Sequence, residues 1–129
     1  MSASRIALTA SLVAVVAWAL KAIAIAMAGG LDRSPAEGPL FVLGLVAALV
    51  GAGAFGAALP AGRSVGIRVL AGAAGVVTMV LLSVGVGALV TAVQPADPSW
   101  VFGEVNLWVG ALTLLGVVVW WRSRRLRPA

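Results

Sequence analysis

Four long apolar runs constrain this chain more than any other feature of its sequence. They cover residues 6–28, 40–59, 69–93 and 99–121. A helix needs about 20 predominantly apolar residues to cross the hydrocarbon core of a bilayer. Within lipid, backbone amides find partners only in a helix or in a closed barrel, and these runs lack the alternation of barrel strands. Each run therefore predicts a transmembrane helix.

The composition points to the same class of protein. Hydrophobic residues make up 62% of the 129 residues and charged residues 10%, whereas a soluble domain is about 45–50% apolar and about 25% charged. Too few polar side chains are present to cover a water-soluble globule. We therefore expect one transmembrane domain over residues 1–129, an all-α integral membrane protein folded as an antiparallel up-down bundle of four transmembrane helices, with the lipid bilayer around it.

The segments between the runs have the composition of turns. They read GGLDRSPAEGP (29–39), PAGRS (60–64) and QPADPSW (94–100), and clusters of Gly, Pro, Asp and Ser are typical of loops. In the last of them, Asp97 suits an N-cap and Pro98 the first helical position. An alternative concerns the first run, because AMAGG (26–30) resembles the cleavage site of a signal peptide. Cleavage would leave three spans, although signal-peptide apolar regions are usually about 7–15 residues long.

The basic residues predict the orientation. In the expected topology one side of the membrane carries Arg33 alone, while the other carries Arg5, Arg63, Arg68, Arg122, Arg124, Arg125 and Arg127. Basic residues concentrate on the cytoplasmic side, so both termini should be cytoplasmic. The charges lie between and beyond apolar runs, so the net charge of +5 does not indicate a nucleic-acid partner. The tail RSRRLRP (122–128) is either a plain topological anchor or a binder of anionic headgroups.

The aromatic and compositional patterns complete the expected location. Trp120 and Trp121 fall at the inner interface and Trp100 at the outer one, as in an aromatic belt. The chain has eight arginines against one lysine and is rich in Ala, Gly and Val. That usage is typical of genes rich in G and C, and we expect the plasma membrane of a bacterium.

The single lysine, Lys21, lies inside the first run. It belongs to a series with heptad spacing, in which every other member is alanine: Ala7, Ala10, Ala14, Ala17, Lys21, Ala24 and Ala28. Small residues mark helix contacts in lipid because they let backbones approach closely. The pattern predicts that Lys21 faces another helix.

Glu104 is the candidate partner of Lys21. Lys21 lies about 10 Å before the end of its run and Glu104 about 9 Å after the start of the fourth, so the two have similar depths. The first and fourth helices of an up-down bundle are neighbours, and charges within a membrane usually pair. We therefore predict an intramembrane pair. The alternatives are that each side chain extends separately to the outer interface, or that one stays uncharged in apolar surroundings.

Small residues also predict close helix crossings elsewhere. They recur every four positions in the second run and again in the third, at Gly44, Ala48, Ala52 and Gly56 and at Ser83, Gly87 and Thr91. Such patterns pack helices within one chain or between copies in a homo-oligomer.

The fourth run carries two polar faces. One face combines Asn106 and Thr113 with Gly103 and Gly110, and Glu104 lies about 140° around the helix from it. The fourth helix therefore offers one face to the first helix and the other to the third helix or to a second subunit.

The inventory of reactive side chains is nearly empty. The chain has no Cys and no His and only four acids, so we expect no catalytic residues, no metal and no cofactor. Membrane enzymes that form disulfides need cysteine. The length and four spans resemble those of the small multidrug resistance transporters, which couple export to protons through a glutamate in the first span. Here the first run has no acid and carries Lys21 instead.

Two functions remain open on the sequence alone. The first is a non-enzymatic role as an accessory, scaffolding or partner-binding membrane protein, which needs only packing faces. The alternative is a small transporter or channel built on Lys21, Glu104 and Asn106, because intramembrane polar groups often mark pathways.

Overall fold

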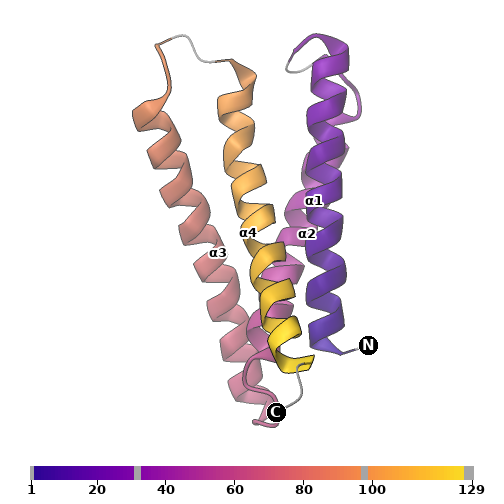
Figure 1. The fold of residues 1–129 in the computed structure, drawn as a ribbon, viewed down its shortest axis with the longest axis vertical. Helices are drawn as coiled ribbons and strands as arrows, with labels where there is room; N and C mark the ends of the chain where they lie inside the picture. Colours follow the sequence, from indigo (N-terminus) through magenta and orange to yellow (C-terminus); the bar gives the residue numbers. More distant parts are fainter. Residues whose placement is uncertain (1, 31–32, 97–98, 127–129) are drawn as a thin grey trace.

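The computed structural model describes residues 2–30, 33–96 and 99–126, which form four α-helices. They are α1 (Ala3–Ala28), α2 (Glu37–Ala58), α3 (Val65–Val93) and α4 (Trp100–Leu126). Successive helices run in opposite directions, and α1 begins at the end of the molecule where α4 finishes (Figure 1). Each helix is long and apolar enough to cross a membrane. The prediction of an all-helical chain with four span-length helices is confirmed.

Three helices extend beyond the apolar runs at the end of the molecule that holds both termini. Helix α1 begins at Ala3, α3 begins at Val65, and α4 continues to Leu126. The added turns carry arginines, including Arg5 and Arg68. A hydropathy pattern shows only which part of a helix is apolar enough for the hydrocarbon core. Arginine is not apolar, but it favours helix formation and can extend its charged group toward water, so the helix continues past the apolar run. The helices are therefore longer than the runs.

Local capping explains where α1 and α3 begin. The Ser2 hydroxyl accepts a hydrogen bond from the Arg5 amide at 3.2 Å, and the Ser64 hydroxyl accepts one from the Ile67 amide at 3.4 Å. Both serines satisfy a first-turn amide as N-caps do. Helix α1 ends at Ala28 and is capped by Gly29, whose φ of +88° is the left-handed conformation that favours glycine. Three residues named above for the third linker and the C-terminal tail lie outside the described residues: Asp97, Pro98 and Arg127. Asp32, in the first linker, lies outside them as well.

Helix α2 packs against α1 with one part of its length and against α3 with another. A Cβ on Gly44 would overlap the indole of Trp18 on α1, and a Cβ on Gly56 would overlap the backbone carbonyl of Ala71 on α3. Ala48 and Ala52, between these two glycines, are buried as well. Only the absence of a side chain at Gly44 and Gly56 allows such close approach.

The buried interior is small and rich in alanine. On α1 it follows one stripe: Ala7, Ser11, Ala14, Ala17, Trp18, Lys21 and Ile25. The stripe shares four members with the alanine series, whereas Ala10, Ala24 and Ala28 are only partly buried. Helix α3 differs from the others, because none of its 29 residues is buried. The interior is therefore formed by α1, α2 and α4, with α3 along its side.

Candidate functional site

Lys21 and Glu104 form a buried ion pair between α1 and α4. The Lys21 ammonium donates a hydrogen bond to Glu104 Oε1, and the two side chains are only 7% and 6% exposed. Both residues lie on inward stripes of their helices, Lys21 between Trp18 and Ile25 and Glu104 in register with Ala111. The structure thus brings together the two charged residues singled out in the apolar runs.

The ammonium also contacts a third helix. Lys21 Nζ lies 5.6 Å from the centroid of the Phe41 ring on α2, which is within the range of a cation–π interaction. Nothing in the sequence pattern separates Phe41 from the other apolar residues of its run. Its role becomes visible only when α1 and α2 are placed side by side.

The second carboxylate oxygen of Glu104 is left open. Oε2 is buried, and among the described residues it has no hydrogen-bond partner. Nearly all buried polar atoms in proteins have a partner, which can be an ordered water. The site therefore offers one hydrogen-bond acceptor inside the molecule, next to a cation.

A pocket of about 390 Å³ adjoins the lysine on the side away from the termini. Its lining consists of Lys21 with residues from the start of α2 and the segment before it: Ser34, Glu37, Gly38 and Phe41. The lining thus combines one ammonium, one carboxylate and one hydroxyl. Such a pocket can hold water or a small polar molecule near the ion pair.

An apolar cluster lies on the other side of the pair. Trp18 lies one turn of α1 closer to the N-terminus, and its indole N–H donates to the Phe41 carbonyl at 3.3 Å. It packs in a cluster with Ala14, Ala47, Ala48 and Ala111. The next buried polar side chain of α1, Ser11, donates to the Ala7 carbonyl of its own helix. The polar region around the pair ends at Trp18.

A second polar contact joins α4 to α3. The Ser83 hydroxyl donates to Asn106 Oδ1 at 3.3 Å, and a Cβ on Gly87 would lie 3.3 Å from Asn106 Nδ2. Thr113, on the same side of α4, is exposed and lines an apolar groove between α2, α3 and α4. Helix α4 therefore uses the Glu104 face for α1 and the Asn106 face for α3.

The described residues contain no group of three or more His, Cys, Asp or Glu placed to hold a metal ion. No protein family matches the chain, and neither a curated protein nor a solved structure shows significant similarity to it.

Proposed function

We propose that this chain is a four-span protein of a bacterial plasma membrane with both termini in the cytoplasm. Apart from Arg33, the described arginines belong to the end of the molecule where α1 begins and α4 finishes: Arg5, Arg63, Arg68, Arg122, Arg124 and Arg125. Basic residues favour the cytoplasmic side. Trp120 and Trp121 belong to the same end and Trp100 to the other, as an aromatic belt at each interface requires.

Its proposed role is to bind another membrane protein without carrying out chemistry itself. The observation that carries this role is the outer face of α3. Six exposed residues share one helix face at alternating spacings of four and three, and five of them are small; we call them the α3 stripe: Ala74, Thr78, Leu81, Gly85, Ala88 and Ala92. Small residues at such spacing let a second helix approach closely.

The surface next to the α3 stripe is shaped for contact as well. An apolar groove of about 390 Å³ runs between α3 and its neighbours, and Ala74 and Thr78 of the stripe line one side of it. Thr113 and Val117 of α4 are on the opposite side. A partner helix seated on the stripe can place a large apolar side chain in this groove.

The test uses two glycines that have space around them. A Cβ at Gly85 or at Gly116 meets nothing within 4 Å, so a larger side chain fits at either position without disturbing the chain's own packing. Gly85 lies in the α3 stripe, and Gly116 lies on an exposed face of α4. We therefore compare Gly85→Leu with Gly116→Leu in protein purified in mild detergent from its native membrane.

We expect the wild-type chain and Gly116→Leu to co-purify with one membrane protein in fixed stoichiometry, and Gly85→Leu to lose it. Circular dichroism and monodisperse elution verify that both variants are folded. A wild-type chain that elutes alone, or equal retention of the partner by both variants, contradicts the role.

A second candidate function is a conduit for protons or small ions, and the open Glu104 Oε2 favours it. A buried acceptor beside a cation, with a polar pocket next to it, resembles the start of a pathway through a membrane. Asn106 takes no part in the Lys21 site, because it bonds Ser83 on another face. Trp18 packs against α2 and α4 on the inward side of the pair, so a conduit has to pass this side chain.

Liposome reconstitution separates the two functions. A conduit predicts proton or ion flux from the purified chain alone, and loss of that flux in Lys21→Met and Glu104→Gln. The partner-binding role predicts no flux above that of empty liposomes. Flux that persists unchanged in both variants would remove the pair from any pathway.

A further inference from the structure

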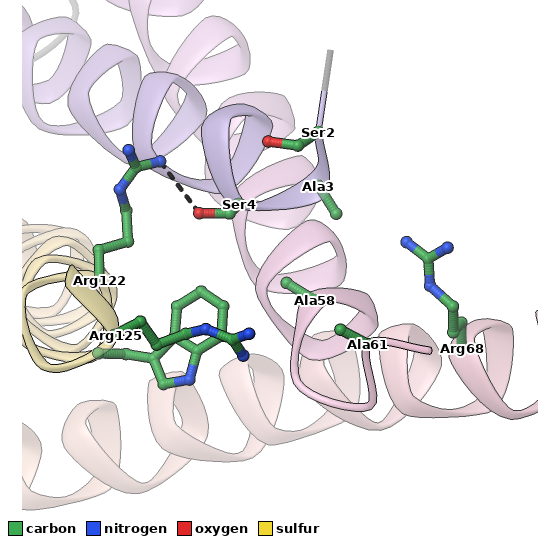
Figure 2. A pocket seen from close by; sticks show the side chains of 9 residues that line it. Ser2, Ala3, Ser4, Ala58, Ala61, Arg68, Arg122 and Arg125 are labelled. Atoms are coloured by element: carbon green, nitrogen blue, oxygen red, sulfur yellow. Dashed lines mark hydrogen bonds between the residues drawn. The ribbon is translucent and has the colours of Figure 1, made fainter. Parts of the chain in front are cut away.

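Three arginines from two helices line one pocket at the end of the molecule where α1 begins and α4 finishes. The pocket has a volume of about 330 Å³, within the range of ligand sites. Arg68 comes from the start of α3, and Arg122 and Arg125 come from the last turns of α4. Figure 2 shows Arg68 and Arg125 approaching the same space from opposite sides, with Ser2 at a third side.

Neutral groups hold all three guanidinium groups in place. Arg122 donates to the Ser4 hydroxyl at 3.0 Å (Figure 2), and Arg68 donates through Nε to the Ala57 carbonyl at 3.3 Å. The Arg125 guanidinium lies 5.0 Å from the centroid of the Trp121 ring. Each arginine keeps further N–H donors for a ligand, because a guanidinium has five.

No acid neutralises this charge within the part of the chain that the structure describes. Glu104 pairs with Lys21, and Glu37 lines the pocket at the opposite end of α2. In the sequence, the other two acids fall in the linkers between α1 and α2 and between α3 and α4. Three positioned cations without a carboxylate form a site for an anion.

The start of α1 adds to the positive potential. Ser2, Ala3 and Ser4 line the pocket, so the first turn of a 26-residue helix borders it. First-turn amides have no acceptor within the helix, and of these the Arg5 amide donates to the Ser2 hydroxyl, which leaves the amides before it for a ligand. The helix dipole is positive at that end. Together with guanidinium groups, such amides are well suited to the oxygens of a phosphate.

We propose that this pocket binds the phosphate of an anionic phospholipid headgroup. The inference relies on the proposed membrane orientation but not on what the α3 stripe binds. Trp121 and the arginines mark this end as the interfacial one, where headgroup phosphates lie. Basic pockets between transmembrane helices on the cytoplasmic side suit anionic headgroups. The apolar surfaces of α3 and α4 next to the pocket accommodate the acyl chains.

The experiment compares arginines inside and outside the pocket. The full chain in a neutral detergent is titrated with dihexanoyl phosphatidylglycerol, with dihexanoyl phosphatidylcholine or with inorganic phosphate, and binding is followed by tryptophan fluorescence. The variants are Arg68→Gln and Arg125→Gln. Arg124→Gln is the matched control, because Arg124 lies on the same turn of α4 and packs against Trp120 rather than lining the pocket.

We expect phosphatidylglycerol to bind to the wild-type chain. In Arg68→Gln and in Arg125→Gln its affinity should fall at least about fivefold, which corresponds to about 1 kcal/mol per contact. Arg124→Gln should change the affinity less than twofold. Because Arg68 and Arg125 belong to different helices, equal losses in both variants identify a shared site. Circular dichroism shows whether each variant is folded.

Three results would overturn the proposal. Equal weakening in Arg124→Gln and Arg125→Gln would mean diffuse attraction to the basic end of the molecule. Equal binding of phosphatidylcholine would mean that net negative charge is not recognised. Binding of inorganic phosphate but not of phosphatidylglycerol, with the same dependence on Arg68 and Arg125, would assign the site to a soluble phosphate instead of a lipid. None of these results bears on the partner of α3, which the Gly85→Leu experiment tests separately.

Discussion

Lys21 and Glu104, 83 positions apart in the chain, pair side chain to side chain in the interior of the molecule. Apart from the arginines at the end of the molecule where α1 begins and α4 finishes, each is the sole charged residue of its helix. Their contact fixes the rotation of α1 relative to α4, because a turn of either helix would move a charge away from its counterion. Phe41 on α2, 5.6 Å from the ammonium, adds α2 to the same arrangement.

Removing one member of this pair should destabilise the fold more than removing both. Lys21→Met and Glu104→Gln each leave a buried charge without a counterion, and we expect each to cost about 3–5 kcal/mol. The double variant leaves none, so it should recover most of that loss. Thermal unfolding in detergent, followed by circular dichroism, measures the four free energies of the double-mutant cycle. Losses that simply add would show that the two side chains do not interact.

Gly44 should tolerate no side chain, because α1 and α2 touch there. In Gly44→Ala the new methyl overlaps the indole of Trp18, and we expect a loss of about 1–3 kcal/mol from the forced shift. The control is Gly85→Ala, which meets nothing within 4 Å. It should be neutral or stabilising by up to about 1 kcal/mol, because alanine favours helix over glycine. Equal effects at the two positions, measured by the same unfolding assay, would contradict the close crossing.

The Ser83–Asn106 hydrogen bond should hold α3 to α4. Asn106→Leu removes it, and we expect a loss of about 0.6 kcal/mol and no more than about 1.7 kcal/mol, the average and the maximum for such bonds between membrane helices. Thr91→Ala is the comparison, since the Thr91 hydroxyl donates at 2.9 Å to Gly87 of its own helix and should matter little to contact between helices. If Thr91→Ala lowers the free energy of unfolding as much as Asn106→Leu does, the hydrogen bond between Ser83 and Asn106 does not specifically stabilise the contact between α3 and α4.

Much of the architecture could be predicted from the sequence because lipid imposes one strong rule on it. Apolar runs of span length must be helices, and polar linkers must separate them, so the number and order of helices follow directly. The helix ends do not follow, because Arg68 and Arg122 are helical yet too polar to register as part of a span. The additional turns at the basic end depend on helix propensity and on serine caps such as Ser64.

Of the candidate site, only the pairing of Lys21 with Glu104 could be predicted from the sequence, because a charge within an apolar run requires a counterion. Lys21 and Glu104 stand out because an apolar background makes each conspicuous. The contacts of Phe41 and Trp18 with neighbouring helices could not be anticipated, because hydropathy alone does not tell which residues an aromatic side chain in an apolar run will contact. The rotation of α1 was also underdetermined: in a helix rich in alanine on every side, Ala10 and Ala24 resemble the buried Ala14 and Ala17. The arginine pocket joins residues far apart in the chain, and only the fold brings Arg68 to Arg125.

In the proposed topology the chain crosses a membrane four times and has both ends in the cytoplasm. Because the chain has no cysteine, one introduced thiol at a time reports its own side of the membrane. Ser99, before α4, and Ser123, near its end, are both exposed, and serine to cysteine is a small change. A maleimide that cannot cross membranes should label Ser99→Cys in intact cells and Ser123→Cys only after the cells are opened. Labelling of Ser123→Cys in intact cells, or of both variants only after opening, would contradict the account.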